Sequence, residues 1–328
     1  MDYVTEPTGY SVPKDQFVKP EDLVVLSDYP PEVRHYIEDI FLKSYPDIIS
    51  THSTDRGNMS KYLGNYTIRL KPGQTLPQHK KLYYLSPVEK MQMQSILEFL
   101  LKNGTIERAN LDGDSYNNYA SPAYLIPKSD QGSCPRLIVN FQQLNPCLQS
   151  EPALLPTAEN LIQSLRDKFV HSSSDMANAF HSITLEPSCR DLTLFATPLG
   201  AFRHASLPTG IKTSPESLSR FMEKILHWEL VYDDNGNVVM DGDLAKMVYS
   251  PIPEVQHIYD DFIVSTELAK TRSESLNIHF KILKKVMGRI HTHKGKISLK
   301  KSQLFKSRVN FFGFFISHNY CCVDQRRV

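Results

Sequence analysis

Residues 255–266 read VQHIYDDFIVST, an apolar run that two adjacent carboxylates, Asp260 and Asp261, interrupt at its centre. An ionised carboxylate is costly to bury without a partner. A tight hairpin with both acids at its tip removes this cost, because the backbone pairs as two short strands while the side chains reach solvent. The stretch therefore predicts a hairpin that presents a carboxylate pair beside an apolar floor.

A third carboxylate, Asp175, ends a second predicted strand, KFVHSSSDM at 168–176. Three clustered carboxylates repel one another and favour cations that relieve the repulsion. Mg²⁺ prefers such hard oxygen ligands together with water and phosphate. Two ions about 3.5–4 Å apart can activate a hydroxyl and stabilise a leaving phosphate oxygen. The pattern favours a phosphoryl-transfer site over the alternative of a structural turn.

A second YDD tripeptide, Tyr232 to Asp234, lies in LVYDDNGNVV. Asp233 and Asp234 run directly into Asn235 and Gly236, a dipeptide that favours a turn. We therefore expect this tripeptide at a surface hairpin tip, without a chemical role.

The chain has 328 residues, of which 41% are hydrophobic and 22% charged. These values are typical of a soluble globular protein with two domains, or one domain with subdomains. The sequence has no apolar run near the ~20 residues of a membrane helix, and its N-terminus shows no secretory signal. Its five cysteines form no CxxC pair, which favours a reducing compartment. His291 and His293 lack a second ligand pair, so we expect solvated surface histidines there rather than a metal site.

The formal net charge of +1 hides an asymmetry. Residues 1–60 hold eleven acidic and five basic side chains, whereas residues 275–322 hold no acidic one. The solvated face of an amphipathic helix is one explanation, but protein surfaces normally mix both signs. A polyanion partner is therefore favoured. The basic side chains of the second segment are Lys281, Lys284, Lys285, Arg289, Lys294, Lys296, Lys300, Lys301, Lys306 and Arg308.

Capping signals and periodicity predict the other elements. A helix is expected after Ser86, with Pro87 first, Glu89 completing a capping box and Gly104 at its end. Strand runs around helices predict an α+β fold, with helices on one face of a sheet. Further helices are expected at 35–49, 157–165, 214–226 and 275–287, and strand pairs at 121–128 with 136–141 and within 308–317.

Five blocks follow one another along the chain: SPAYLIPK…RLIVNFQQLN, SSSDMANAFHSI, LFATPLGAFRHASLPTGIKTSPESLSRFM, IYDDFIV and LKKSQLF…VNFFGF. With the lead-in that begins NYTIRLKPGQ, this series resembles the reverse transcriptases of LTR retroelements, those of gypsy-type retrotransposons or retrovirus-like Pol. The resemblance extends from about Tyr66 to Ser317. It implies a right-hand polymerase fold with fingers and palm, in which the thumb is largely absent.

The resemblance also implies site residues. Asp175, Asp260 and Asp261 match the three catalytic, metal-binding aspartates of the family. Lys301 matches a lysine that protonates the leaving pyrophosphate, and Lys300 is an equal candidate by sequence.

Other matched positions concern the nucleotide. Lys128 and Arg136 match residues that hold the incoming triphosphate, and Phe180 matches the aromatic residue that blocks the ribose 2′ position. Gly210 matches a glycine where the backbone approaches the template–nucleotide pair. Without the neighbouring blocks, Lys128 and Arg136 would be solvated strand charges, and Phe180 would be a core side chain.

The remaining matches concern the nucleic acid. Phe311, Phe312 and Gly313 match the hairpin that grips the primer end, with a plain core strand as the alternative. The basic segment would hold the template–primer backbone in a salt-sensitive way. Its expected phosphate contacts are Lys284, Lys285 and Arg289.

The chain departs from the family at several points. Thr209 stands where relatives carry Gln or Phe, and residues 229–253 are longer than the family pattern. No thumb, RNase H, protease or integrase pattern is visible, so a fragment of a polyprotein or a degraded copy is expected. The expected parts are an N-terminal linker or docking segment (1–65), fingers (66–150 and 183–213), palm (151–182 and 214–320, with the insertion near 229–253) and a truncated start of the thumb (321–328).

Together these patterns predict an RNA-directed DNA polymerase. It would add dNTPs to a primer 3′-hydroxyl with two Mg²⁺ ions, which Mn²⁺ can replace. Expected partners are an RNA or DNA template–primer and other segments of a Pol polyprotein, with no membrane. The expected location is intracellular and cytoplasmic, with virus-like particles as one setting. A non-catalytic nucleic-acid-binding remnant and a DNA-templated repair polymerase are the alternatives.

Overall fold

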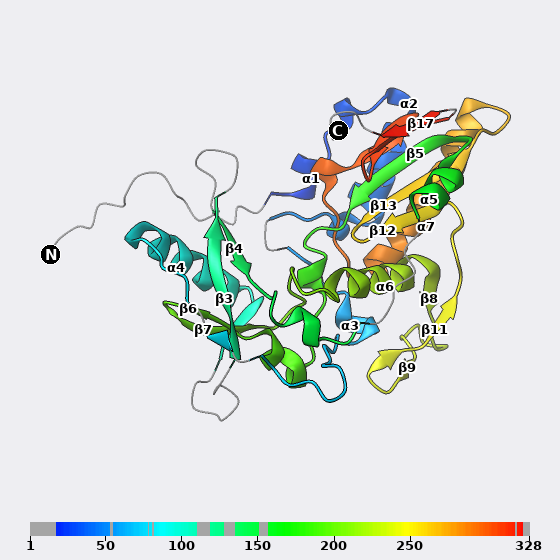
Figure 1. Cartoon of the computed structure of the whole chain (residues 1–328). Helices are drawn as coiled ribbons and strands as arrows, with labels where there is room; N and C mark the ends of the chain where they lie inside the picture. Colours follow the sequence, from blue (N-terminus) through cyan, green and yellow to red (C-terminus); the bar gives the residue numbers. More distant parts are fainter. Residues whose placement is uncertain are drawn as a thin grey trace. The chain divides into compact units, whose positions relative to one another are not determined.

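The computed structural model describes residues 18–52, 55–77, 79–80, 82–109, 119–127, 135–150, 157–318 and 320–323. The chain divides into two compact units (Figure 1). The first unit contains Asn65–Glu151 and Thr184–Ser214. The second unit contains Phe17–Gly64, Pro152–Ile183 and Pro215–Val328.

The first unit is a six-stranded mixed sheet with one long helix. The strand order is β1-β3-β6-β7-β2, and β4 pairs with β3. Helix α4 (Pro87–Lys102) begins with the expected capping box, in which Ser86 Oγ accepts a bond from the Glu89 N–H and Glu89 accepts one from the Ser86 N–H. The strands are β1 (His79–Lys80), β2 (Ile106–Arg108), β3 (Tyr119–Ile126), β4 (Arg136–Val139), β6 (Phe195–Thr197) and β7 (Gly200–His204).

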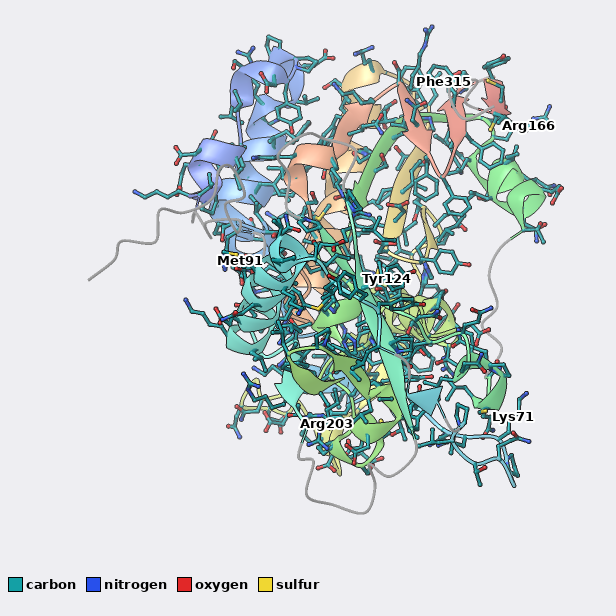
Figure 2. The ribbon with its side chains drawn as sticks, turned by 60° about the vertical axis from the view of Figure 1, so that its left-hand side comes forward. Lys71, Met91, Tyr124, Arg166, Arg203 and Phe315 are labelled. Carbon is teal, nitrogen blue, oxygen red and sulfur yellow. The ribbon has the colours of Figure 1, made fainter. Side chains whose placement is uncertain are left out.

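Apolar side chains of α4 and of several strands form the core of the first unit. Met93 and Leu97 of the helix pack with Ile106, Phe195 and Phe202. Met93 and Leu97, four residues apart, thus mark the buried face of α4. A charged cluster lies at β7, where Arg203 pairs with Glu107 at 2.7 Å and with Asp191 at 2.6 Å (Arg203 is labelled in Figure 2).

The centre of the second unit is a four-stranded antiparallel sheet in the order β12-β13-β5-β14. The predicted end of β5 at Asp175 and the predicted hairpin of β12 and β13 are confirmed. The hairpin turns at Tyr259 and Asp260, so Asp260 is at the tip as expected, whereas Asp261 is already the first residue of β13 and pairs with Ile258. The strands are β5 (Lys168–Asp175), β12 (Val255–Ile258), β13 (Asp261–Glu267) and β14 (Gln303–Lys306).

Helices α6 (Ser214–His227) and α7 (Arg272–Thr292) cover one face of this sheet. His279 of α7 bonds to Ser172 of β5 at 2.8 Å and to Thr266 of β13 at 3.0 Å. Glu223 of α6 reaches His257 of β12 at 3.5 Å. Because strand side chains alternate between faces, the neighbouring positions Asp175 and Asp261 point to the other face.

That other face packs on α5 (Ala158–Leu165) and on the hairpin of β15 (Arg308–Phe311) and β16 (Phe314–Ser317). Leu161, Ile263 and Val309 meet there in one buried cluster. Strand β17 (Tyr320–Val323) extends the hairpin to three strands. The expected helices on one face are thus α6 and α7, and the structure departs from the prediction by adding the short helix α5 on the other face.

Residues 18–52 and 55–64 belong to the second unit. They contain α1 (Pro20–Leu23), α2 (Pro31–Glu38) and α3 (Ser60–Leu63). The expected single helix at 35–49 is wrong: α2 passes into a π-helical stretch at Asp39–Ser44, and a 3-10 turn follows at Pro46–Ile48. Proline cannot continue a helix and disfavours helical backbone at the preceding residue, which explains the break at Tyr45. Ile37, Phe41 and Ile49 are fully buried.

Residues 228–250, called the protrusion below, form a small β structure. Its base is a ladder of β8 (Trp228–Leu230) and β11 (Met247–Tyr249). A second pair, β9 (Met240–Asp241) and β10 (Leu244–Ala245), follows the turn at residues 234–236. Among the helices of the described residues, none has both the length and the apolarity that a membrane crossing requires.

Candidate active site

Two neighbouring strands bring the predicted carboxylates together. Asp175, the last residue of β5, is the register partner of Asp261, the first residue of β13. The Met176 N–H donates to the Asp260 carbonyl oxygen at 2.9 Å, which ties the hairpin turn to the end of β5. Tyr259 has a positive φ of 55°. This backbone conformation makes the hairpin turn tight, so that Asp260 projects beside Asp261.

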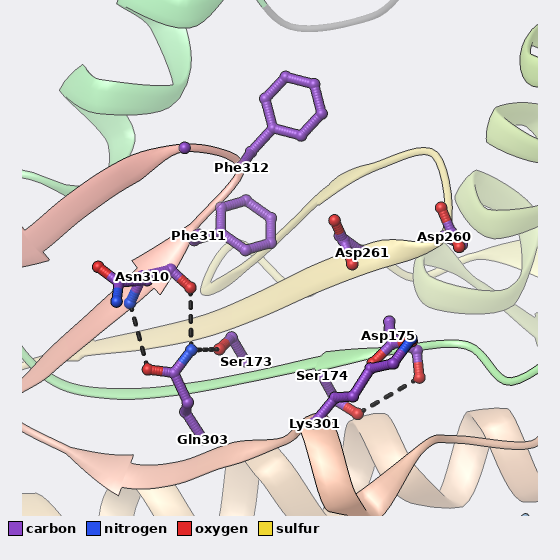
Figure 3. A pocket seen from close by; sticks show the side chains of 11 residues that line it. Ser173, Ser174, Asp175, Asp260, Asp261, Lys301, Gln303, Asn310, Phe311 and Phe312 are labelled. Atoms are coloured by element: carbon purple, nitrogen blue, oxygen red, sulfur yellow. Dashed lines mark hydrogen bonds and ion pairs between the residues drawn. The ribbon is translucent and has the colours of Figure 1, made fainter. Parts of the chain in front are cut away.

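The three carboxylates open into one pocket of about 370 Å³ (Figure 3). The pocket has an acidic end with Lys301 and an end formed by the β15–β16 hairpin. All of its lining residues belong to the second unit. They are Ser173, Ser174, Asp175, Asp260, Asp261, Lys301, Gln303, Asn310, Phe311, Phe312 and Gly313.

Burial and like charge shape the electrostatics at the acidic end. Burial raises the pKa of Asp260, and the charge of Asp175 raises it further, while Lys301 lowers it. The Lys301 ammonium lies 3.1 Å from Asp175 Oδ2, and the lysine side chain is 73% exposed. A cation therefore already relieves part of the repulsion that the sequence predicted.

The donor set fits a hard divalent cation. Among the residues that the structure describes, no three Asp, Glu, His or Cys side chains lie close enough together to hold one ion as they stand. Asp175, Asp260 and Asp261 nevertheless line one pocket, and their oxygens are the ligand type that Mg²⁺ prefers. These three residues would hold such an ion.

The β15–β16 hairpin forms the opposite end of the pocket. Phe312 and Gly313 form its turn with positive φ angles of 46° and 82°. Phe311 is buried in the cluster shared with α5, whereas Phe312 is 46% exposed. The Phe312 ring lies 6.5 Å from the Tyr259 ring, centroid to centroid. The predicted gripping segment thus lies beside the turn that carries Asp260.

The predicted nucleotide-binding residues are divided between the units. Arg136 is exposed at the start of β4, and Gly210 lies near Val139 at the other end of that strand. Gly210 has a φ of 94°, and its carbonyl oxygen accepts a bond from Asn145 Nδ2 at 3.1 Å. Both residues belong to the first unit, and the predicted residue Lys128 lies outside the described residues.

Phe180 belongs to the second unit and opens a 3-10 turn, Phe180–Ser182. It is half-buried, so the ring is not a plain core side chain. The Ser182 hydroxyl donates to the Ala179 carbonyl at 2.6 Å and holds this turn five residues after Asp175. The 2′-blocking role of Phe180 stays a prediction.

The predicted phosphate contact at Arg289 is wrong. Its side chain is 6% exposed and lies inside the second unit. The guanidinium donates to Glu229 at 2.6 Å, to the Ser250 carbonyl at 2.6 Å and to the Leu226 carbonyl. Arg289 therefore fastens the base of the protrusion to α7, where a phosphate has no access.

Several basic side chains of the acid-free segment are paired with acids elsewhere in the second unit, which accounts for part of the charge asymmetry. Lys284 pairs with Asp39 at 2.6 Å, and Lys285 lies 3.4 Å from Glu229. Two more pairs join residues 1–60 to the acid-free segment, His291 with Asp47 and Lys296 with Asp55. Arg272, just before that segment, pairs with Glu32.

The predicted solvated position of His293 is wrong as well, because that ring is 1% exposed.

The second YDD lies at the tip region of the protrusion, as predicted. Asp233 Oδ1 accepts bonds from the N–H groups of Asn235 at 2.9 Å and Asn237 at 2.8 Å. These donors, Asn237 first, lower the pKa of the exposed Asp233 carboxyl. The carboxylate is thus used to close its own turn.

Sequence reasoning missed Gln303 and Asn310 as pocket residues. Gln303 bonds to the backbone of Asn310 at 3.0 and 3.2 Å and to Ser173 at 3.4 Å (Figure 3). Neither residue has a charge or a spacing that marks it. Position alone, within the last two blocks of the series, was the available signal.

Comparisons with known proteins agree with this geometry. The sequence model of the family described as "Reverse transcriptase (RNA-dependent DNA polymerase)" matches residues 126–316, more than half of the chain. The chain is 29% identical over 159 residues to the retrovirus-related Pol polyprotein from transposon 412 of Drosophila melanogaster, covering 47% of this chain and 12% of that protein. It is 28% identical over 210 residues to the enzymatic polyprotein of figwort mosaic virus (strain DxS), covering 63% of this chain and 27% of that protein.

Solved structures give the same fold. The foamy viral protease-reverse transcriptase in complex with an RNA/DNA hybrid matches with a TM-score of 0.72 and 20% identity, covering 99% of this chain and 38% of that one. The expected right-hand polymerase fold is thereby confirmed. This chain belongs to the reverse transcriptase (RNA-dependent DNA polymerase) family.

Proposed function

We propose that the chain is the polymerase part of an LTR-retroelement reverse transcriptase that adds dNTPs to a primer 3′-hydroxyl on an RNA template. The main support is one observation. Asp175 and Asp261 are register partners on adjacent strands, and Asp260 opens into the same pocket as the β15–β16 hairpin. Acids on two rigid strands can be held in the geometry that in-line phosphoryl transfer requires.

Asp175, Asp260 and Asp261 would hold two Mg²⁺ ions, for which Mn²⁺ can substitute. When bound, these ions would supply charge stabilisation to the attacking and leaving oxygens. The exposed ammonium of Lys301, next to Asp175, would hold the proton that the leaving pyrophosphate takes up. The turn at Phe312 and Gly313 would orient the primer end.

The first unit would bind the incoming nucleotide. Arg136, together with Lys128, would hold the triphosphate, because guanidinium and ammonium groups suit phosphate oxygens. Gly210 would let the backbone approach the base pair, since it lacks a side chain. Phe180 of the second unit would exclude a ribose 2′-hydroxyl.

The related proteins also support proposals about the binding partners of this chain and about its fingers and palm. The foamy viral protease-reverse transcriptase has been solved in complex with an RNA/DNA hybrid and in complex with double-stranded DNA. We propose an RNA or DNA template–primer for this chain as well. The chain spans 12% and 27% of the two curated relatives named above, both polyproteins, so further Pol segments are proposed partners. Residues 66–150 and 183–213 would be the fingers, and 151–182 and 214–320 the palm.

The second YDD offers a matched control for the test. Primer extension on an RNA template with dNTPs is measured in Mg²⁺ and in Mn²⁺ for wild type, Asp260→Asn and the double variant Asp233→Asn, Asp234→Asn. Asp260→Asn should lose extension, because a pocket carboxylate is removed. The double variant should stay within about threefold of wild type, because exposed turn substitutions usually cost under ~0.5 kcal/mol. Equal extension by wild type and Asp260→Asn would refute the assignment.

A further inference from the structure

One side chain, Gln303, links three strands at the floor of the pocket. Its Oε1 accepts a bond from the Asn310 N–H at 3.2 Å, and its Nε2 donates to the Asn310 carbonyl at 3.0 Å. The same Nε2 lies 3.4 Å from the Ser173 hydroxyl of β5. The backbone partners fix the orientation of the amide, because an N–H only donates and a carbonyl oxygen only accepts.

This contact resembles the pairing of two strands. In an antiparallel ladder, alternate residues exchange both N–H···O bonds with the residue opposite. The N–H and C=O of Asn310 go to Gln303, although its register partner in β16 is Phe315. These two groups therefore point away from β16, and the Gln303 amide satisfies them in place of another strand.

The amide joins two sheets whose backbone ladders are separate. Gln303 is the first residue of β14, at the edge of the central sheet, whereas β15 belongs to the three-stranded sheet with β16 and β17. On one side, Val309 and Phe311 anchor β15 through apolar contacts. Apolar packing lacks direction, so the paired hydrogen bonds are what can fix the hairpin along its own axis.

The position of the hairpin along that axis bears on the site. Phe312 follows Asn310 by two residues, and its ring meets Tyr259, the residue before Asp260. Gln303 itself follows Lys301 by two residues. A slide of β15 would thus move the Phe312 turn relative to the carboxylates while leaving the carboxylates in place.

We propose that Gln303 is a positioning residue that sets the β15–β16 hairpin against the carboxylates, and through it the primer 3′ end. Only the part of this proposal that concerns the primer 3′ end rests on the proposed polymerase function. Methionine has nearly the same length and volume as glutamine but cannot form these bonds. Asparagine keeps the amide on a side chain one methylene shorter.

The experiment compares Gln303→Met and Gln303→Asn with wild type and with a control, Gln163→Met. Gln163 is an exposed residue of α5, so the control makes the same chemical change outside the pocket. Amide hydrogen exchange of residues 308–317 is measured in each protein without nucleic acid. Single-turnover primer extension at saturating dNTP is measured per titrated active site, together with the Kd for template–primer.

Exchange at Asn310 should rise about tenfold in both Gln303 variants, in line with the loss of about one net hydrogen bond. The single-turnover rate should fall about tenfold, because a small misplacement of the reacting group is costly. The Kd should stay within about twofold, since phosphate contacts dominate it. The control should match wild type in all three.

Unchanged exchange in folded Gln303→Asn and Gln303→Met would overturn the proposal. So would a loss of extension that reflects only fewer active sites at an unchanged rate for each, since that is the signature of lower stability. If wild type itself extends no primer, the polymerase function fails, whereas the exchange measurement still decides whether Gln303 holds the hairpin.

Discussion

At the level of single residues, Asp260 and Asp233 occupy the same tripeptide in opposite surroundings. Asp260 is partly buried in the same pocket as Asp175, and its pKa is raised. Asp233 is exposed, accepts bonds from two backbone N–H groups, and its pKa is lowered. The first environment opposes the ionised carboxylate and the second favours it.

This contrast predicts opposite effects on stability. A raised pKa means that the folded state disfavours the ionised form, so the stability that Asp260 costs grows as the pH rises above its unfolded pKa and is complete above its folded pKa. Asp260→Asn should therefore raise the free energy of unfolding at pH 7 in a metal-free buffer. The gain should vanish below about pH 4, where the carboxyl is protonated in both states.

Asp233→Asn is the control of opposite sign, because a lowered pKa means that ionised Asp233 contributes stability above its unfolded pKa. Denaturant unfolding with EDTA at pH 7 and pH 3.5 measures both variants. A loss of stability in Asp260→Asn at pH 7 would contradict the electrostatic account of the pocket.

At the level of elements, β5 is unusual because its buried centre is polar. His171, Ser172, Ser173 and Ser174 are all buried. Ser172 bonds to His279 of α7 and also accepts the Phe305 N–H at 3.0 Å. The central strand is thus held to the helix by hydrogen bonds, which are costly to leave unmade inside a protein.

His279 should make this contact sensitive to acid. Burial lowers the pKa of His279 to about 3, with a smaller contribution from His171. The unfolded chain takes up this proton near pH 6.5, so the stability that neutral His279 provides is present above that pH. It is lost progressively as the pH falls towards the folded pKa.

His279→Gln should accordingly be less stable than wild type at pH 7, and the difference should narrow by up to ~1.4 kcal/mol per pH unit between pH 6 and pH 4. Urea unfolding at each pH gives the two curves. Parallel curves would show that His279 does not titrate on unfolding.

Local patterns predicted most elements, and distant partners account for what they missed. The capping box of α4, the end of β5 and the hairpin of β12 and β13 depend on residues close in sequence, and each is found where expected. The break at Tyr45 also has a local cause, Pro46, which was available but not used. Arg289 could not be placed, because its burial depends on Glu229, 60 residues away. Gln303 is similar, since only the folded hairpin brings the Asn310 backbone to it.

At the level of the whole molecule, more of the charged side chains in the second unit form ion pairs with one another than the sequence suggests. The acidic N-terminal segment pairs with α7 and the turn after it. Such exposed pairs contribute little stability each, but they reduce the positive potential that α7 would otherwise present. The polyanion footprint predicted from residues 275–322 is therefore smaller than ten basic side chains.

Variants of the buried Arg289 and of the more exposed Lys284 and Lys285 should differ in their effect on nucleic-acid binding. Lys284→Gln and Lys285→Gln should each flatten the slope of log K against log salt for unrelated sequences, if these side chains leave their acidic partners for phosphates. Arg289→Gln should leave the slope unchanged and lower the free energy of unfolding by roughly 1–3 kcal/mol, because the carbonyl groups of Leu226 and Ser250 lose their charged donor. Binding titrations over a salt series and urea unfolding measure the two quantities. A changed slope in Arg289→Gln would contradict its burial.

The ladder at the base of the protrusion has a practical consequence. Trp228 faces Tyr249 and Leu230 faces Met247, so the chain leaves and re-enters the second unit at adjacent points. Paired strands lie about 5 Å apart, so residues 231–246 form a loop whose two ends are close together. A fluorophore, an affinity tag or a whole reporter domain inserted at Asn235–Gly236 would therefore move as a side branch. The second unit thereby offers a built-in attachment point at which a probe can be added for single-molecule fluorescence without interrupting the strands that line the pocket.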